Sequence, residues 1–201
     1  MNREQGNAAE LPAMKVVLAS QSPFRRRALD LLGLDYEVHP SRIDEKAIRD
    51  SDPVSLTRKL AEAKAWKVAS EFPNAIIVSG DAVVAKNGAI YEKPRDRAEA
   101  VEFLEDLSGS KFRFVTSLAV LRSATQNLLS AVEASEITFR SLLDREIDEY
   151  VNKYDVLKFA GAFEGDGVLR FAEHISGSYN FIFALPVNRL VAFLRNQGVQ
   201  V

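Results

Sequence analysis

One stretch near the N-terminus constrains the fold most, because a short apolar run leads there directly into a helix. Residues 14–19 have the length and composition of a buried strand. Ser22 is placed to cap the helix that follows, Pro23 suits its first position, and Gly33 suits its end. A helix N-terminus presents free N–H groups and the positive end of the helix dipole. The stretch therefore predicts an anion-binding turn between a strand and a helix.

The first turn of this helix carries three arginines, Arg25, Arg26 and Arg27. Positive side chains interact unfavourably with the helix dipole at this end, so they reduce the stability of the helix. Their presence is explained if a polyphosphate supplies the missing negative charge. The alternative is an ordinary capped helix with a solvated basic face, and the turn alone leaves both interpretations open.

Composition narrows the chemistry that such a site can use. The chain of 201 residues has no cysteine, which excludes a thiolate nucleophile and thiolate-ligated metal centres. Its two histidines, His39 and His174, lack the spacing of metal ligands. The formal net charge of −2 gives no indication of a nucleic-acid polymer as partner. The basic residues therefore act locally.

Length and hydropathy predict one globular domain over residues 14–201, since the chain is long enough to bury a sizeable core. No apolar run approaches about 18 residues, so no membrane partner is expected. Residues 1–13 are mostly polar and lack the apolar middle of a signal peptide. We interpret them as a disordered leader of a cytoplasmic protein.

Two carboxylates follow predicted strands. Residues 35–39 alternate like a half-buried strand and lead to a loop with Asp44 and Glu45. An adjacent Asp-Glu pair is more often solvated surface, and this stays the alternative for Glu45. The run over residues 75–79 leads to Asp81, beside a glycine that lets a ligand approach. A carboxylate at such a strand end is well placed as a general base or metal ligand.

Two lysines lie where they can reach the same site. Residues 52–72 predict a helix by composition and by their Asp-Pro start. Lys64 lies at the edge of its apolar face, so the stem can be buried while the ammonium reaches a site. The alternative is a solvated helix lysine. Asn87-Gly88 is the strongest hairpin signal of the chain, and the returning arm carries Lys93.

The other predicted elements have less bearing on a site. They are helices over 96–107, over 141–152 and after Pro186, antiparallel strands over 111–122 and 128–139, a glycine-rich loop over 158–167 and a strand over 168–175.

The turn Ser20-Gln21-Ser22-Pro23 followed by arginines resembles the signature of the Maf family of nucleoside triphosphate pyrophosphatases. Later segments extend the resemblance from about residue 15 to residue 199. These segments are Ile43-Asp44-Glu45, Leu60-Ala61-Glu62-Ala63-Lys64-Ala65, Gly80-Asp81, Lys93-Pro94, Ala160-Gly161-Ala162 and the stretch from Gly177-Ser178-Tyr179 to Leu185-Pro186.

The resemblance implies a Maf/ITPase-like α/β fold, in which an elongated, mixed and twisted sheet is flanked by helices and two lobes surround a cleft. It implies hydrolysis of a nucleoside triphosphate to the monophosphate and pyrophosphate. It also implies that Asp81 is the proton acceptor, that Glu45 belongs to the active site and that Lys93 is a phosphate ligand. Members are often dimers, so a homodimer is allowed, although nothing in the sequence tests it.

The needs of the reaction assign the remaining residues. Ser20, Ser22 and Arg25, with Lys64 and Lys93, are expected to neutralise the phosphates. Asp81 and Glu45 are expected to hold a divalent cation, Mg, Mn or Co, through their oxygens. A rival from another class is a nucleotide-binding regulator, because the family also bears a name linked to septum formation. In that case the same pocket would bind without turnover.

The sequence departs from the family pattern where substrate choice is made. Phe24 and Asp166 stand where the dTTP/UTP branch has Arg and Gln, whereas a branch acting on 7-methyl-GTP has an aromatic residue and an acid. A methylated guanine is cationic, so an aromatic face attracts it, and a carboxylate can accept its N–H donors. The pyrimidine branch stays the alternative, as does Phe24 as a core residue. Ala82 replaces a threonine and Ala184 a glycine, so one substrate contact at residue 82 is in doubt.

Overall fold

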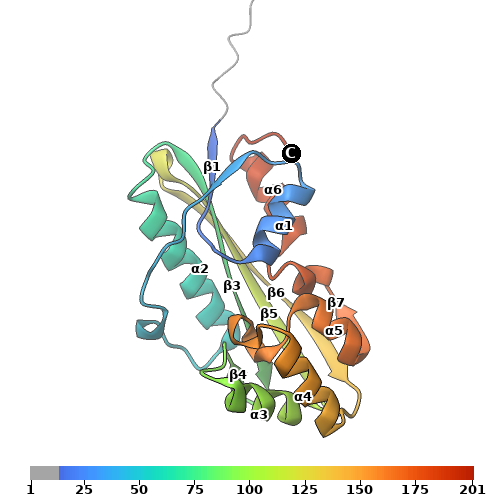
Figure 1. The fold of residues 1–201 in the computed structure, drawn as a ribbon. Helices are drawn as coiled ribbons and strands as arrows, with labels where there is room; N and C mark the ends of the chain where they lie inside the picture. The colour runs from blue at the N-terminus through green and yellow to red at the C-terminus, as the bar shows by residue number, and fades with distance from the viewer. Residues whose placement is uncertain (1–13) are drawn as a thin grey trace, which may run out of the picture.

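The computed structural model describes residues 14–201, and within that range it leaves the side chain of Asp166 undescribed (Figure 1). The leader predicted over residues 1–13 lies outside the described residues. The single domain expected over residues 14–201 stays a prediction. No helix of the described part is long and apolar enough to cross a membrane.

A mixed sheet of seven strands forms the centre of the described chain. Along the sheet the strands follow the order β2-β1-β3-β5-β6-β7, and β4 pairs with β3 as a hairpin arm. β1 pairs in parallel with β2 and β3, and the other pairings are antiparallel. The strands are β1 (Lys15–Leu18), β2 (Tyr36–Val38), β3 (Ala75–Lys86), β4 (Ala89–Tyr91), β5 (Lys111–Arg122), β6 (Asn127–Phe139) and β7 (Ala172–Gly177).

The described helices flank this sheet, so the predicted α/β class is confirmed. The α-helices are α1 (Pro23–Leu31), α2 (Pro53–Ala69), α3 (Arg97–Leu107), α4 (Asp144–Lys153), α5 (Gly165–Phe171) and α6 (Val187–Asn196). Short 3₁₀ turns lie in the connections between helices and strands: η1 (Glu45–Ala47), η2 (Ser123–Thr125), η3 (Val156–Lys158), η4 (Ala160–Ala162) and η5 (Tyr179–Ile182).

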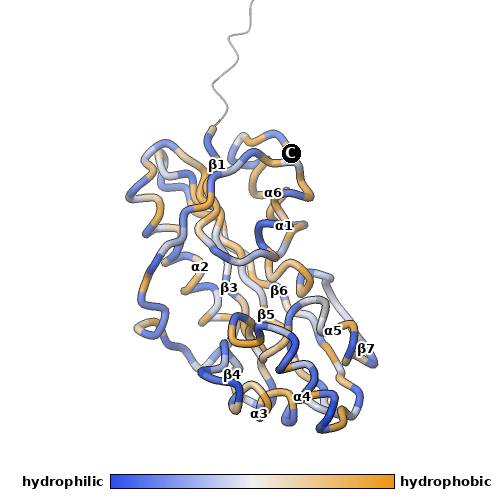
Figure 2. The backbone as a smooth tube through the Cα atoms, in the orientation of Figure 1, coloured by the Kyte–Doolittle hydropathy of each residue, from blue (hydrophilic) through white to orange (hydrophobic). Residues whose placement is uncertain are grey.

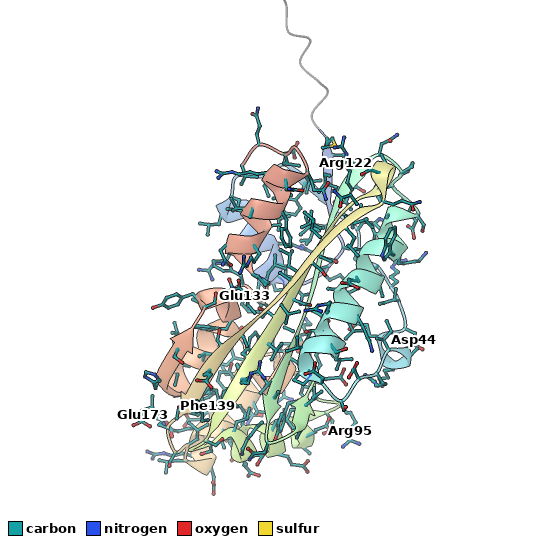
Figure 3. The ribbon with its side chains drawn as sticks, turned by 180° about the vertical axis from the view of Figure 1, so that it is seen from behind. Asp44, Arg95, Arg122, Glu133, Phe139 and Glu173 are labelled. Atoms are coloured by element: carbon teal, nitrogen blue, oxygen red, sulfur yellow. The ribbon has the colours of Figure 1, made fainter. Side chains whose placement is uncertain are left out.

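Alternation along the central strands assigns the helices to two faces, because successive strand residues point to opposite sides. Val17 and Ile77 pack with residues of α2 on one face. Their neighbours Val16 and Ile76 pack with residues of α1 and α6 on the other face. Figure 3, seen from behind, shows α2 in front of the sheet, and Figure 2 shows hydrophobic residues along the central strands.

The face that carries α1 and α6 bears two separate cores, which form the two lobes that the sequence predicted. Near the start of β3, Val78 belongs to the core with α1 and α6. Near its end, Val84 belongs to a second core with α3, α4 and α5. Residues 80–82 of β3, which include Asp81, therefore lie between the two cores.

An interruption in pairing exposes one edge of β3 at the same point. β1 pairs with β3 as far as Val78, and β4 pairs with it only from Val84. Between these residues the described strands pair with β3 only through β5. The sheet thus leaves a gap beside Asp81 where a ligand can reach the strand.

Two predictions about local structure are wrong and one is confirmed. Residues 168–171 belong to α5 rather than to a strand, which begins only at Ala172 as β7. Asp81 lies in the middle of β3, not at a strand end. The hairpin at Asn87-Gly88 is confirmed, since both residues have the positive φ (+50° and +84°) that a type I′ turn needs.

Candidate functional site

The turn between β1 and α1 is arranged differently from a standard helix cap. Ser22 occupies the N-cap position, but its side chain makes no capping hydrogen bond, so that prediction is wrong. Its backbone N–H instead donates to Ser20 Oγ at 3.2 Å. Arg25 also donates to this hydroxyl, over 3.1 Å from Nη1. Ser20 therefore accepts hydrogen bonds from both sides at the opening of the turn.

Arg25 is buried, so it is not part of a solvated basic face. Its Nε donates to the carbonyl oxygen of Ala184, 159 residues away in sequence, at 3.1 Å. Burial lowers the pKa of the Arg25 guanidinium, while the negative charges of Asp81 and Glu45 act in the opposite direction. The guanidinium thus joins the turn to the loop that precedes α6. Ala184 has a φ of +48°, which explains why a glycine suits this position.

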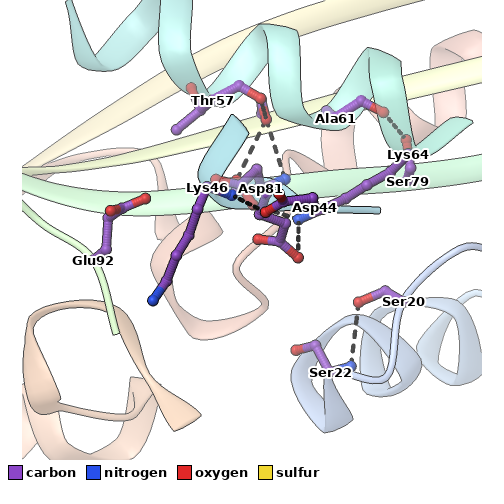
Figure 4. A network of polar contacts seen from close by, with 12 residues as sticks. Ser20, Ser22, Asp44, Lys46, Thr57, Ala61, Lys64, Ser79, Asp81 and Glu92 are labelled. Atoms are coloured by element: carbon purple, nitrogen blue, oxygen red, sulfur yellow. Dashed lines mark hydrogen bonds and ion pairs between the residues drawn. The ribbon is translucent and has the colours of Figure 1, made fainter. Parts of the chain in front are cut away.

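Lys64 brings the two predicted carboxylates together. Its ammonium, on α2, lies 2.7 Å from Asp81 Oδ1 on β3 and 3.2 Å from Glu45 Oε1 on η1. The side chains of Lys64 and Asp81 are 7% and 10% exposed, whereas that of Glu45 is 47% exposed. Figure 4 shows Lys64 beside Asp81, with Ser20 and Ser22 across from them. The Lys64 side chain is therefore buried while its ammonium reaches Asp81, and its role at a site stays a prediction.

The backbone around Asp81 is fixed by its neighbours. The N–H of Asp81 donates to Ser117 Oγ at 3.1 Å, and Ser117 Oγ donates to the carbonyl of Thr57 at 2.7 Å. A Cβ on Gly80 would lie 2.6 Å from both Leu185 Cδ1 and the Ser117 carbonyl oxygen. The glycine is therefore needed for packing of the protein itself, rather than for the approach of a ligand as the sequence indicated.

These groups line one pocket of about 690 Å³, which lies between the two lobes. Its described lining includes six basic and three acidic side chains, so it favours an anionic ligand. We call a set of its polar and charged lining residues the polar wall, formed by Ser20, Ser22, Arg25, Glu45, Lys64, Asp81 and Lys93. We call its aromatic lining residues the aromatic wall, formed by Phe24, Phe114, Phe159, Phe163 and Phe181.

Phe24 is half-buried and lines the pocket, so it is not simply a core residue. Its ring meets that of Phe159 edge to face, with centroids 5.4 Å apart at 64°. Sequence reasoning missed Phe159 and Phe163, as well as Glu164, which lines the same part of the pocket. The glycine-rich segment that contains all three was the available signal.

The other predicted residues have mixed outcomes. Ala82 and Lys93 line the pocket, and Lys93 is exposed. The backbone of Asp166 belongs to the first turn of α5, not to a flexible loop. Its side chain lies outside the described part, so its expected contact with the base stays a prediction. The adjacent Gly165 does line the pocket.

Glu45 and Asp81 offer the donor atoms that a divalent cation uses. No group of three or more His, Cys, Asp or Glu side chains suited to a metal occurs among the described residues. Mg²⁺, however, commonly takes one or two carboxylates and completes its shell with substrate phosphates and water. The two carboxylate oxygens that converge on the Lys64 ammonium fit this pattern, and no geometry of a bound ion is implied.

Comparisons with known proteins show which family the chain resembles. The family model described as Maf-like protein matches residues 15–197. The chain is 35% identical over 189 residues to the 7-methyl-GTP pyrophosphatase of Aliivibrio fischeri, covering 93% of this chain and 98% of that protein. It is also 35% identical over 175 residues to the dTTP/UTP pyrophosphatase of Pyrococcus furiosus, covering 86% and 90%. The solved Ham1 protein of Staphylococcus aureus has a TM-score of 0.48 at 16% identity, covering 91% of this chain and 99% of that one.

Proposed function

We propose that this chain, which belongs to the Maf-like protein family, hydrolyses a nucleoside triphosphate to the nucleoside monophosphate and pyrophosphate. Relatives that are named pyrophosphatases and align over most of both chains support this proposal. The observation that carries it is the Asp81 carboxylate, held by the Lys64 ammonium inside a pocket with mainly basic charge. Such an arrangement has both a proton acceptor and the charge to bind a polyphosphate.

In this proposal Asp81 acts as the general base. Lys64 occupies Asp81 Oδ1, and among the described residues nothing donates a hydrogen bond to Oδ2. Oδ2 can therefore accept a proton from water as the water oxygen attacks the α-phosphorus. The new oxygen–phosphorus bond forms as the bond to the bridging oxygen breaks, and that oxygen leaves with pyrophosphate.

The basic groups of the polar wall neutralise the phosphates during this step. Arg25 and Lys93 line the pocket and would contact phosphate oxygens, and the ammonium of Lys64 would shift from Asp81 towards them. Fixed donors in a partly enclosed pocket stabilise developing charge more effectively than water does. Ser20 holds the Arg25 guanidinium in place through its hydroxyl.

Glu45 and Asp81 would hold a divalent cation that the proposal includes as a cofactor. When bound, such a cation neutralises phosphate charge and orients the substrate. The Asp81 side chain is buried and fixed by its neighbours, whereas the exposed Glu45 side chain has room to adjust to an arriving ion.

We propose 7-methyl-GTP as the preferred substrate. The aromatic wall supports this choice, because rings attract a cationic base by about 0.5–2 kcal/mol. The Phe24 ring contacts that of Phe159 and both rings line the pocket, so a base can stack against them. The alternative substrates are dTTP and UTP, since relatives with both kinds of name are similar to this chain to the same degree.

A panel of triphosphates tests both levels of the proposal. The purified protein is incubated with 7-methyl-GTP, GTP, dTTP, UTP and ATP, each with Mg²⁺, Mn²⁺ or Co²⁺ and with EDTA, and pyrophosphate is assayed. We expect release of pyrophosphate, fastest from 7-methyl-GTP and lost with EDTA. Release from dTTP or UTP above all others would support the alternative substrates.

The same panel separates an enzyme from a nucleotide-binding regulator. Nucleotide binding measured by calorimetry, with no pyrophosphate released from any triphosphate under any metal, would overturn the enzymatic proposal. Release of orthophosphate instead of pyrophosphate would overturn the site of cleavage.

A further inference from the structure

We propose that Arg42 binds the terminal phosphates of the substrate, the pair that leaves as pyrophosphate. The inference rests on the proposed function and adds a phosphate-binding residue to it. Arg42 lines the pocket, and no motif of the sequence singled it out. Three features of the described structure carry the inference: its place at the sheet edge, its lack of a charge partner and its backbone conformation.

The first feature is the place of Arg42 in the sheet. β1 and β2 are parallel, with Leu18 opposite Val38, and the His39 N–H donates to the Leu18 carbonyl at 3.0 Å. The carboxyl ends of both strands therefore lie at the same edge. Ligands of open α/β sheets bind beyond this edge. Ser20 follows one strand end and Arg42 follows the other.

The second feature is the charge around Arg42. The nearby carboxylates have other partners, because Glu45 pairs with Lys64 and Asp44 accepts the Lys46 N–H at 3.0 Å. Among the described residues, Arg42 has no hydrogen bond or ion pair through its side chain. An exposed guanidinium without a carboxylate, at the mouth of an anion pocket, presents a planar fork of donors that matches a phosphate group.

The third feature is the backbone of Arg42. Its φ is +50°, a left-handed conformation that is unfavourable for a residue with a Cβ. Residues held in such conformations are concentrated at ligand-binding sites, where the surrounding structure supports the strain. A glycine would adopt this backbone more easily, so selection for stability alone does not explain an arginine here.

The layout of the pocket identifies which phosphates Arg42 would contact. In the sheet order, β2 lies at one end and β5, which carries Phe114, lies towards the other, and the ring of Phe163 lies 6.0 Å from that of Phe114. Figure 2 shows the loop between β2 and α2, which contains Arg42, as largely hydrophilic. A nucleotide with its base at the aromatic wall therefore directs its terminal phosphates towards Arg42.

The test measures equilibrium binding to the full chain in the presence of Mg²⁺. Pyrophosphate, and separately 7-methyl-GMP, is titrated into wild type, Arg42→Gly and Arg42→Lys. We expect Arg42→Gly to weaken pyrophosphate binding by about tenfold to a hundredfold, as for a lost charge-assisted hydrogen bond. Binding of the monophosphate should stay within about twofold, and Arg42→Lys should recover part of the loss.

The thermal stability of Arg42→Gly should change in the direction opposite to its pyrophosphate affinity. Arg42→Gly relieves the left-handed strain, so its Tm should rise by about 2–4 °C while its pyrophosphate affinity falls. Arg49→Ala is the matched control, because Arg49 lies on the same connection but pairs with Glu92 at 3.2 Å and is not among the described pocket residues. It should leave pyrophosphate affinity unchanged.

The outcomes separate this inference from the proposed function. If wild type releases pyrophosphate from a triphosphate but Arg42→Gly binds pyrophosphate as wild type does, the inference is wrong and the proposed function stands. Equal weakening of pyrophosphate and monophosphate would also overturn the assignment to the terminal phosphates. A wild type that releases no pyrophosphate overturns the proposed function itself.

Discussion

The two walls of the pocket are built from different kinds of structure. The acid–base groups of the polar wall stand mainly on regular elements, as with Asp81 on β3 and Lys64 on α2, joined by a contact of 2.7 Å. Most of the aromatic wall stands on short turns and the connections beside them, and its contacts are between rings, such as the pair Phe24–Phe159. Under the proposed function, this difference would assign the reaction mainly to helices and strands and base selection mainly to short turns.

The largest expected effect is a loss of pyrophosphate release when one residue of the polar wall, Asp81, is changed. Asp81→Asn keeps the size of the side chain but removes the proton acceptor, so pyrophosphate release should fall by about 10²–10⁴-fold for every triphosphate. Asp50→Asn is the matched control, since Asp50 also binds a lysine of α2, Lys59, at 2.6 Å but is not among the described pocket residues. An active Asp81→Asn protein with unchanged Tm would contradict the role of Asp81.

The next effect concerns the two residues that are expected to select the base. Phe24→Arg combined with Asp166→Gln should weaken 7-methyl-GTP and favour dTTP or UTP, because a paired contact to a base edge contributes about 1–3 kcal/mol of discrimination. The ratio of kcat/KM values should therefore shift tenfold to a hundredfold. A substrate ranking identical to that of wild type would show that these residues do not select the base.

A smaller effect is expected at Arg25, which joins the turn between β1 and α1 to the loop that precedes α6. Arg25→Lys keeps the charge but cannot donate to both Ser20 Oγ and the Ala184 carbonyl in the same geometry. The kcat/KM should fall by about tenfold for all triphosphates, and Tm should also fall, because a buried acceptor loses its donor. Steady-state kinetics and a thermal melt measure the two effects. An unchanged kcat/KM would mean that these two hydrogen bonds of Arg25 do not position the turn between β1 and α1 for the reaction.

The smallest expected effect is a change in stability at Ala184, in the loop that precedes α6 and accepts a hydrogen bond from Arg25. Ala184→Gly should raise the free energy of unfolding by about 1 kcal/mol, because the φ of +48° is strained for alanine and natural for glycine. This corresponds to a Tm increase of about 2–4 °C. Activity should stay within about twofold. A decrease in Tm would show that the Ala184 methyl group has a packing role that outweighs the strain.

The polar wall was largely predictable from the sequence because its residues lie beside strong local signals. Ser20 follows a strand, Lys64 lies at the edge of an apolar helix face, and Asp81 follows an apolar run with a glycine. The long strands and the Asn87-Gly88 hairpin were predictable for the same reason. The family resemblance supplied the role of Glu45, which composition alone assigns to solvent.

What the sequence missed depends on contacts between distant segments. The hydrogen bond between Arg25 and the Ala184 carbonyl spans 159 positions, and no local pattern encodes it. α5 has only seven residues and starts with Gly-Asp-Gly, so its propensity favours no helix, and tertiary packing decides its form. The divalent cation, the homodimer and the cytoplasmic location stay predictions.

One measurement tests whether the polar wall serves the reaction and the aromatic wall selects the base. It is the ratio of kcat/KM for 7-methyl-GTP to kcat/KM for UTP, determined for wild type, Lys93→Ala and Phe159→Ala. We expect Lys93→Ala to lower both values and leave the ratio within about twofold, whereas Phe159→Ala should lower the ratio by about threefold or more, because part of an aromatic contact is lost. A ratio that changes with Lys93→Ala and is constant with Phe159→Ala would show that the two roles are not divided in this way.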